Sequence, residues 1–82
     1  MDVMHELEKF LLSEATFDLD RKSIKPDEDL LIQGIIDSMG ILKLVSFMEN
    51  RFAIKINNDD IIPANFQNLN CLKELAEKKL KI

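Results

Sequence analysis

The chain has few of the residue types from which active sites and metal sites are usually built. Its 82 residues include one cysteine, one histidine, two glycines, and no tryptophan or tyrosine. The lone Cys71 cannot form an internal disulfide or supply a multi-cysteine metal site. Two glycines are too few for a glycine-rich phosphate-binding loop. We therefore do not expect an enzyme that acts alone, and we assign no catalytic residue and no metal site.

Charge and apolar content narrow the class of protein further. The chain has 15 acidic and 11 basic residues, and its net charge of -4 disfavours binding to nucleic acid through phosphate neutralisation. Hydrophobic residues make up 46% of it, too many for disorder, yet no stretch reaches the about 18 consecutive apolar residues of a membrane span. The acidic N-terminus lacks the positive charge of a signal peptide. We expect a cytoplasmic monomer with a single domain, residues 1–82.

Apolar residues recur at three- and four-residue spacings in several parts of the chain, which is typical of amphipathic helices. One such part is residues 2–16, where Asp2 can cap a helix. Another begins near Ser38, where Asp37 and Ser38 supply capping chemistry, and ends near Phe52. These two patterns predict the first two long helices.

The remaining segments complete the expected fold. Residues 17–37 lose the helical period, and Pro26 prevents a helix from continuing through the residue before it, so we expect a long loop. Four apolar side chains would pin this loop to the core: Leu30, Leu31, Ile35 and Ile36. A brief helix is expected at residues 60–66, and a last long helix begins at a cap formed by Asn68 or Asn70. The sequence thus predicts an all-α fold, a small four-helix bundle of three long helices and one short, with the long loop between helices 1 and 2.

The second helix has the widest apolar face. Its expected buried stripe consists of Ile41, Leu44, Val45, Met48 and Phe52, widened by Leu42 and Phe47. The residues expected to be solvated are Lys43, Ser46, Glu49, Asn50 and Arg51. We therefore expect this helix to be the central one, with Leu42 in the core.

Ser38 is the residue that points to a function. It is a hydroxyl at the expected N-terminus of the second helix, directly after Asp37. A helix N-terminus presents unpaired N–H groups and a partial positive charge, so a phosphate attached there is favoured by about 0.3 to 1 kcal/mol. Ser38 is therefore a candidate for phosphate attachment, although a serine in this position also acts as a plain helix cap.

The residues around Ser38 resemble a known family. The stretch Gly34-Ile35-Ile36-Asp37-Ser38-Met39-Gly40 resembles the phosphopantetheine attachment site of acyl carrier proteins. Corresponding features follow along most of the chain: Leu30-Leu31, the helix through Leu44-Val45-Ser46-Phe47-Met48-Glu49, the exit Arg51-Phe52-Ala53-Ile54, and Pro63-Ala64-Asn65-Phe66 before the last helix.

The resemblance implies a specific role for Ser38. A separate phosphopantetheinyl transferase would move 4'-phosphopantetheine from coenzyme A onto the Ser38 hydroxyl, which makes the chain a phosphoprotein. The thiol of this covalent cofactor would hold an acyl or aminoacyl group as a thioester. By the same likeness, Asp37 would help the transferase and its metal ion recognise the site; it can also act simply as an anion at a helix start.

Departures from the family pattern bear on the partner enzymes. Gly40 and Lys43 stand where carriers of fatty-acid synthesis usually have acids, and the Asp-Ser-Met-Gly order looks more like stand-alone carriers that serve acyl- or aminoacyl-adenylating ligases, including D-alanyl carrier proteins. Met39, Leu42 and Lys43 follow Ser38 and are candidates for partner contact. A pocket for the acyl chain, by carry-over from the family, would be lined by residues such as Ile41, Val45, Ile61 and Leu75.

Two other interpretations use the same residues. In a helical protein-protein interaction module without a prosthetic group, Ser38 would only cap the helix. In a small hydrolase, Ser38 would need a base, and the single histidine, His5, would have to reach it from another helix. The pattern favours a carrier that delivers acyl or aminoacyl groups to a ligase and a downstream acyltransferase or synthase, in lipid, cell-envelope or secondary-metabolite biosynthesis.

Overall fold

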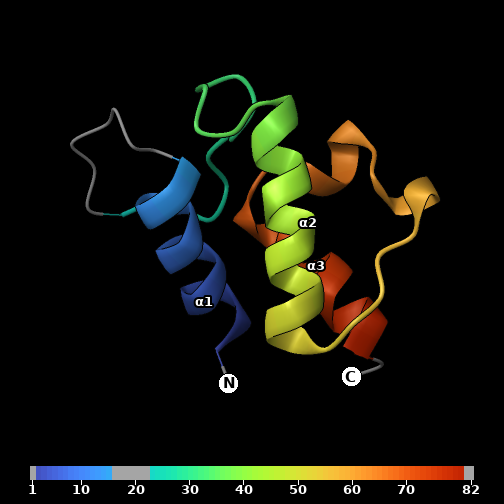
Figure 1. The fold of residues 1–82 in the computed structure, drawn as a ribbon. Coiled ribbons are helices and arrows are strands. Elements are labelled where there is room, and N and C mark those ends of the chain that lie inside the picture. The colour runs from blue at the N-terminus through green and yellow to red at the C-terminus, as the bar shows by residue number, and fades with distance from the viewer. Residues whose placement is uncertain (1, 16–22, 81–82) are drawn as a thin grey trace.

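Three α-helices and several short turns make up the described part of the protein (Figure 1). The computed structural model describes residues 2–15 and 23–80. The α-helices are α1 (Val3–Phe10), α2 (Ser38–Phe52) and α3 (Leu69–Leu80). A π-helical turn, η1 (Leu11–Ala15), continues α1, and two 3₁₀ turns, η2 (Asn58–Asp60) and η3 (Pro63–Phe66), lie between α2 and α3. Those two ranges contain no β-strand, so the expected all-helical class is confirmed.

The expected four-helix bundle is not confirmed. The short helix predicted at residues 60–66 is instead divided between η2 and η3. Ile62 between them is extended, with φ -126° and ψ 151°, because the ring of Pro63 disfavours helical geometry in the residue before it. Of the predicted long loop, residues 17–22 lie outside the described part, and so does residue 16, the predicted end of the first helix. Residues 23–37 form turns and irregular backbone.

Side-chain caps fix where each α-helix begins. Asp2 Oδ1 accepts a hydrogen bond from His5 N (3.2 Å), and Asp37 Oδ1 accepts one from Gly40 N (2.8 Å). At the start of α3 it is Asn68, and not Asn70, whose Oδ1 accepts from a backbone donor, Cys71 N (2.8 Å). Each bond satisfies a backbone N–H that has no partner within its own helix.

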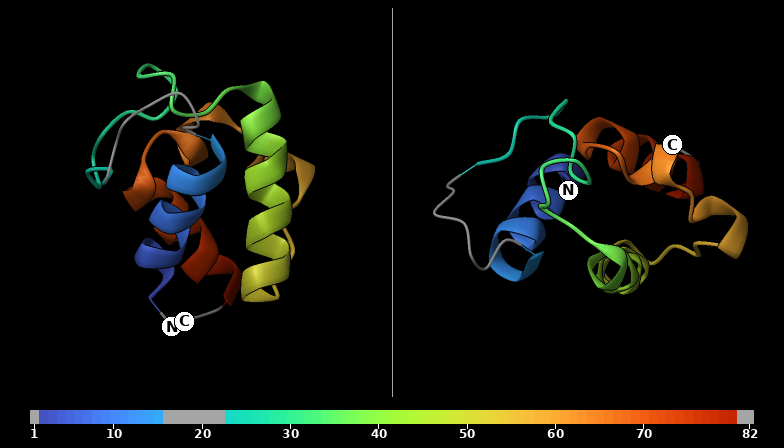
Figure 2. Two further views of the ribbon diagram at one scale, coloured as in Figure 1. Left: turned by 60° about the vertical axis from the view of Figure 1, so that its left-hand side comes forward. Right: turned by 90° about the horizontal axis from the view of Figure 1, so that it is seen from above.

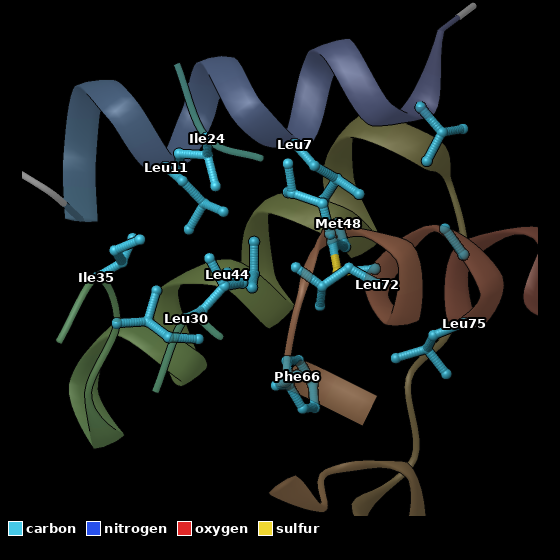
Figure 3. Packing of buried hydrophobic residues seen from close by; sticks show 14 of the residues in the cluster. Leu7, Leu11, Ile24, Leu30, Ile35, Leu44, Met48, Phe66, Leu72 and Leu75 are labelled. Atoms are coloured by element: carbon cyan, nitrogen blue, oxygen red, sulfur yellow. The ribbon is translucent and has the colours of Figure 1, made fainter. Parts of the chain in front are cut away.

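The core is a single apolar cluster formed by α1 with η1, the segment before α2, α2 with Ile56 after it, η3 and α3 (Figure 3). Its fully buried large side chains are Leu7, Leu11, Leu30, Ile35, Leu44, Met48, Phe66, Leu69 and Leu72. Burying one such side chain contributes about 1.5 to 3 kcal/mol, so the many small contributions hold the short helices together.

The second helix is less enclosed than its apolar content suggested. Only Leu44, Met48 and Phe52 of α2 are buried, whereas the shorter α3 buries four residues. Leu42, which we expected in the core, is 57% exposed. Seen from above, α2 lies on one side of the molecule, with α1 and α3 on the other (Figure 2). The prediction of a central helix was therefore wrong, because α2 has partners on one side and leaves the other open.

The segment before α2 is held against the core, as predicted. Leu30, Ile35 and Ile36 are buried, and Leu31, the fourth residue predicted to pin the loop, is half-buried against the same core. The backbone is also tied to the start of α3: Leu30 N donates to the carbonyl of Gln67 (2.7 Å), and the carbonyl of Pro26 accepts from Asn70 N (3.1 Å). Buried side chains and long-range backbone bonds together fix the chain where it enters α2.

A strained residue ends α2. Ala53 adopts left-handed backbone geometry with φ 55°, and the carbonyl of Glu49 accepts hydrogen bonds from Ala53 N and from Ile54 N. Helices commonly end this way, but glycine is the residue that adopts the geometry without a steric cost.

Replacing Ala53→Gly is expected to stabilise the protein. Glycine removes a steric cost of about 1 to 2 kcal/mol from the folded state. It also raises the conformational entropy of the unfolded chain, which lowers the stability by about 0.4 to 1 kcal/mol. Urea unfolding should show a net gain of up to about 1.6 kcal/mol. Ala64→Gly is the matched control: Ala64 has negative φ, so its replacement should destabilise, and an equal response of both variants would contradict the explanation.

An ion pair links η2 to α3. Asp60 Oδ2 lies 2.6 Å from Lys79 Nζ and also accepts a hydrogen bond from Asn57 N (3.0 Å). The Lys79 ammonium, followed by the Asn57 N–H, lowers the pKa of the Asp60 carboxyl from its ordinary value. A lowered pKa in the folded state means that the ion pair stabilises the protein above the unfolded-state pKa of Asp60 and ceases to do so as the pH falls through the folded-state pKa.

Replacing Asp60→Asn should therefore make the free energy of unfolding depend less on pH in the acid range. Urea unfolding between about pH 6 and pH 2 is expected to show the wild type losing more stability on acidification than the variant. Asp59→Asn is the control, because Asp59 is an exposed neighbour that forms no ion pair with any residue of the described ranges. Parallel curves for the wild type and Asp60→Asn would show that the ion pair is not coupled to folding.

Candidate functional site

Ser38 is the first residue of α2, and its side chain is exposed. The cap of this helix is its neighbour Asp37, whose carboxylate accepts the hydrogen bond from Gly40 N. The Ser38 hydroxyl makes no hydrogen bond with any residue in the described ranges. The interpretation of Ser38 as a plain cap is therefore wrong, since Asp37 does that work and leaves the hydroxyl open to solvent.

The start of α2 is also suited to an anion. The first intrahelical bond runs from Ile41 N to the carbonyl of Asp37 (2.8 Å), so the N–H groups of Ser38 and Met39 have no partner within the helix. These groups carry the partial positive charge of the helix end. A phosphate linked to Ser38 would lie beside them, which is favourable by about 0.3 to 1 kcal/mol.

Gly40 allows close packing of the first turn. A Cβ atom at this position would lie 3.3 Å from Ile36 Cβ and 3.4 Å from Asp37 Oδ1. Ile36 is buried, so it has little room to move away. The absence of a side chain at Gly40 therefore lets the buried loop approach the helix and keeps the Asp37 carboxylate in its capping position.

A groove of about 700 Å³ lies along the exposed side of α2. Its lining residues are Phe10, Met39, Leu42, Lys43, Ser46, Phe47, Asn50 and Arg51. The three residues predicted for partner contact, Met39, Leu42 and Lys43, all line it, and Met39 is 65% exposed. We name this feature the α1–α2 groove, because it combines one side chain of α1 with seven of α2.

Aromatic and ionic contacts join the two helices at this groove. The rings of Phe10 and Phe47 stack with centroids 4.3 Å apart, and Phe47 meets Phe52 edge to face at 6.0 Å. Arg51 Nε donates to Glu6 Oε1 at 2.8 Å. These contacts make α1 a fixed wall of the groove.

The sequence did not predict that residues beyond Met39, Leu42 and Lys43 would line the groove. Phe10 was not singled out from the sequence, and Ser46, Asn50 and Arg51 were expected to be merely solvated. One signal was available: the apolar residues of α2 are too many and too widely spread to fit on one buried face, so some of them had to line an exposed surface.

The four residues expected to line a pocket for the acyl chain lie in the core or against it. Ile41, Val45 and Ile61 are half-buried against the core, and Leu75 is buried within it. None of these four lines the α1–α2 groove. Apolar packing accounts for their positions.

The other candidate groups add no chemistry. Cys71 is half-buried and His5 is exposed. The described residues hold no cluster of three or more side chains able to bind a metal ion. None of the described helices combines the length and apolar character that crossing a membrane requires. In the described part of the chain Ser38 has no hydrogen-bonded base of the kind that activates a nucleophilic serine.

Comparison with known proteins agrees with this geometry. A family model described as the phosphopantetheine attachment site matches residues 12–78, which include the whole of α2. No curated protein matches the chain. Members of the matched family are non-catalytic carriers with a covalently attached 4'-phosphopantetheine, and they interact with a phosphopantetheinyl transferase and with synthetic enzymes. The match covers most of the chain, which therefore belongs to the family of phosphopantetheine-binding carrier proteins.

Proposed function

We propose that Ser38 is the residue that receives the 4'-phosphopantetheine arm, and that residues 1–82 form a single stand-alone carrier domain. The observation that carries this proposal is the exposed Ser38 hydroxyl, free of the capping bond and placed at the positive end of α2. A bound arm would supply a thiol that holds acyl or aminoacyl groups as thioesters. Carriage of such groups, and not catalysis, is the function of the chain.

The other serines of the matched region lack this combination of features. The Ser13 hydroxyl donates to the carbonyl of Phe10 (3.1 Å), and Ser23 lies in the segment before α2. Ser46 is exposed but lies in the middle of α2, where backbone N–H groups are already paired within the helix. Only Ser38 offers both a free hydroxyl and unpaired N–H groups beside it.

Attachment is a phosphoryl-transfer reaction in which Ser38 is the acceptor. Its Oγ forms a bond to the pantetheine-side phosphorus of coenzyme A, and the pyrophosphate P–O bond breaks. Adenosine 3',5'-bisphosphate leaves, and the hydroxyl proton passes to a base of the transferase. Asp37 contributes a carboxylate next to the reacting oxygen, where it can face the metal ion of the transferase while it caps α2.

The partner enzymes follow from the surface next to Ser38. We assign Met39, Leu42 and Lys43 to partner contact, since they are exposed, adjacent and on the same helix. The proposed partners are an acyl- or aminoacyl-adenylating ligase and a downstream acyltransferase or synthase, in lipid, cell-envelope or secondary-metabolite biosynthesis. Lys43 supports a carrier of this class over one of primary fatty-acid synthesis. We place the protein in the cytoplasm, where coenzyme A and such ligases are available, as a monomer.

The attachment site can be tested by mass. The purified protein is incubated with coenzyme A, Mg²⁺ and a promiscuous phosphopantetheinyl transferase, and is then weighed. We expect one gain equal to phosphopantetheine less water, which is absent in Ser38→Ala and retained in Ser13→Ala, a change at an exposed serine outside the groove. Ser38→Ala should remain folded, because Ser38 is not the cap. Loss of the gain in Ser13→Ala, or its persistence in Ser38→Ala, would refute the assignment.

The role of Asp37 in recognition by the transferase can be separated from its role as a helix cap. Asparagine caps helices about as well as aspartate, so Asp37→Asn should retain stability, whereas Asp37→Ala should lose about 0.5 to 2 kcal/mol. Both changes remove the charge and should slow transfer roughly tenfold or more. The measurements are urea unfolding and the initial rate of arm attachment. An unchanged rate in Asp37→Asn would limit Asp37 to its structural role.

A further inference from the structure

The α1–α2 groove has a shape that attachment of an arm does not require. Its lining residues recur in successive turns of α2, from Met39 to Arg51. Since a helix rises about 1.5 Å per residue, the groove extends about 18 Å along the axis of α2. Phe10 of α1 also lines it and is held in place by its stacking on Phe47. The groove is therefore about three helical turns long.

The apolar part of the α1–α2 groove is open to solvent. Met39 is 65% exposed and Leu42 is 57% exposed, although both are large apolar residues. Phe10 and Phe47, which are half-buried, line the same groove, and we call these four side chains its apolar strip. An apolar strip on a helix surface, with a neighbouring helix as its wall, fits the apolar face of another amphipathic helix.

The charges at the groove have one sign. Lys43 and Arg51 line it, and no acidic residue of the described chain does so. Arg51 is paired with Glu6, so Lys43 is left as the cation without an ion pair among the described residues. The only acidic residue of α2, Glu49, is not part of the lining, and its Oε2 accepts a hydrogen bond from Ile56 N. This positive local charge lies on a chain whose net charge is -4.

We propose that the α1–α2 groove docks an acidic amphipathic helix of a partner enzyme. The apolar side chains of that helix enter the strip between Leu42 and Phe10, and one of its carboxylates pairs with Lys43. The proposal rests on the proposed function, because a carrier must present Ser38 to the enzymes that load and unload it. It adds the chemistry of the partner: acidic and apolar, and not basic.

Two synthetic peptides of about 18 residues provide the probe. Both are amphipathic helices with Leu and Phe at i, i+3, i+4 and i+7; one carries Glu on the flanks of the apolar stripe, and the other carries Lys at the same positions. Each is titrated into the ¹⁵N-labelled full chain and followed by NMR. We expect the acidic peptide to bind, with shift changes concentrated at residue 10 and residues 39–51, and the basic peptide to bind at least about threefold more weakly.

Matched variants test the two components of the groove. Lys43→Glu should weaken binding of the acidic peptide about three- to tenfold, and Lys55→Glu, the same charge change at an exposed site after α2, should not. Leu42→Asn should weaken binding about tenfold or more. Ile62→Asn removes an equally apolar exposed side chain outside the groove and should have no effect.

Several results would overturn the proposal. These are equal or tighter binding of the basic peptide, no binding of either peptide, shift changes outside the groove, or self-association of the chain that Leu42→Asn abolishes. Ser38→Ala keeps the groove and should still bind the acidic peptide. Binding without arm attachment would therefore sink the proposed function alone, and arm attachment without binding would sink this inference alone.

Discussion

The hydrogen bond from Gly40 N to the carboxylate of Asp37 is the interaction on which the site depends. It satisfies a backbone donor that the helix cannot satisfy and makes Ser38 the first helical residue. If the Ser38 hydroxyl were the cap, α2 would begin later and that oxygen would be occupied by a backbone N–H. The two neighbouring polar residues thus differ in role: Asp37 caps the helix, and the Ser38 hydroxyl stays exposed, without a hydrogen bond to any described residue.

The capping residue Asp37 is positioned by the buried segment that precedes it. Gly40 has no Cβ, so the buried side chain of Ile36 lies close to the first turn, and Asp37 follows it directly in the chain. The loop that ends at Ile36 is fastened in turn to the start of α3, through the bond from Leu30 N to the carbonyl of Gln67. The position of an exposed hydroxyl is therefore set by contacts that lie in the core. This explains how a small protein can keep the proposed attachment residue in solvent and still hold it in one place.

Local patterns carried much of the information about this fold. The bounds of α2 follow from the apolar period and the polar pair at its start, and the pinning of the loop follows from Leu30 and Ile35. The division of the predicted short helix depended on how strongly Pro63 acts on Ile62, which competes with the capping residues around it. The exposure of Leu42 and the groove could not be read locally, because they depend on which side of α2 the other helices cover.

One helix carries both the proposed attachment site and the proposed docking surface, and its geometry relates them. Residues four apart lie on the same face of a helix, so Ser38 is in line with Leu42 and Ser46, and these last two line the groove. A partner seated against Leu42 therefore meets Ser38 one turn away, without any movement within the carrier. Because α2 is continuous from Ser38 to Phe52, that distance is constant for every enzyme that uses the groove. Different partners can share one carrier for this reason, provided that the active site of each lies at the same distance from the part of the partner that occupies the groove.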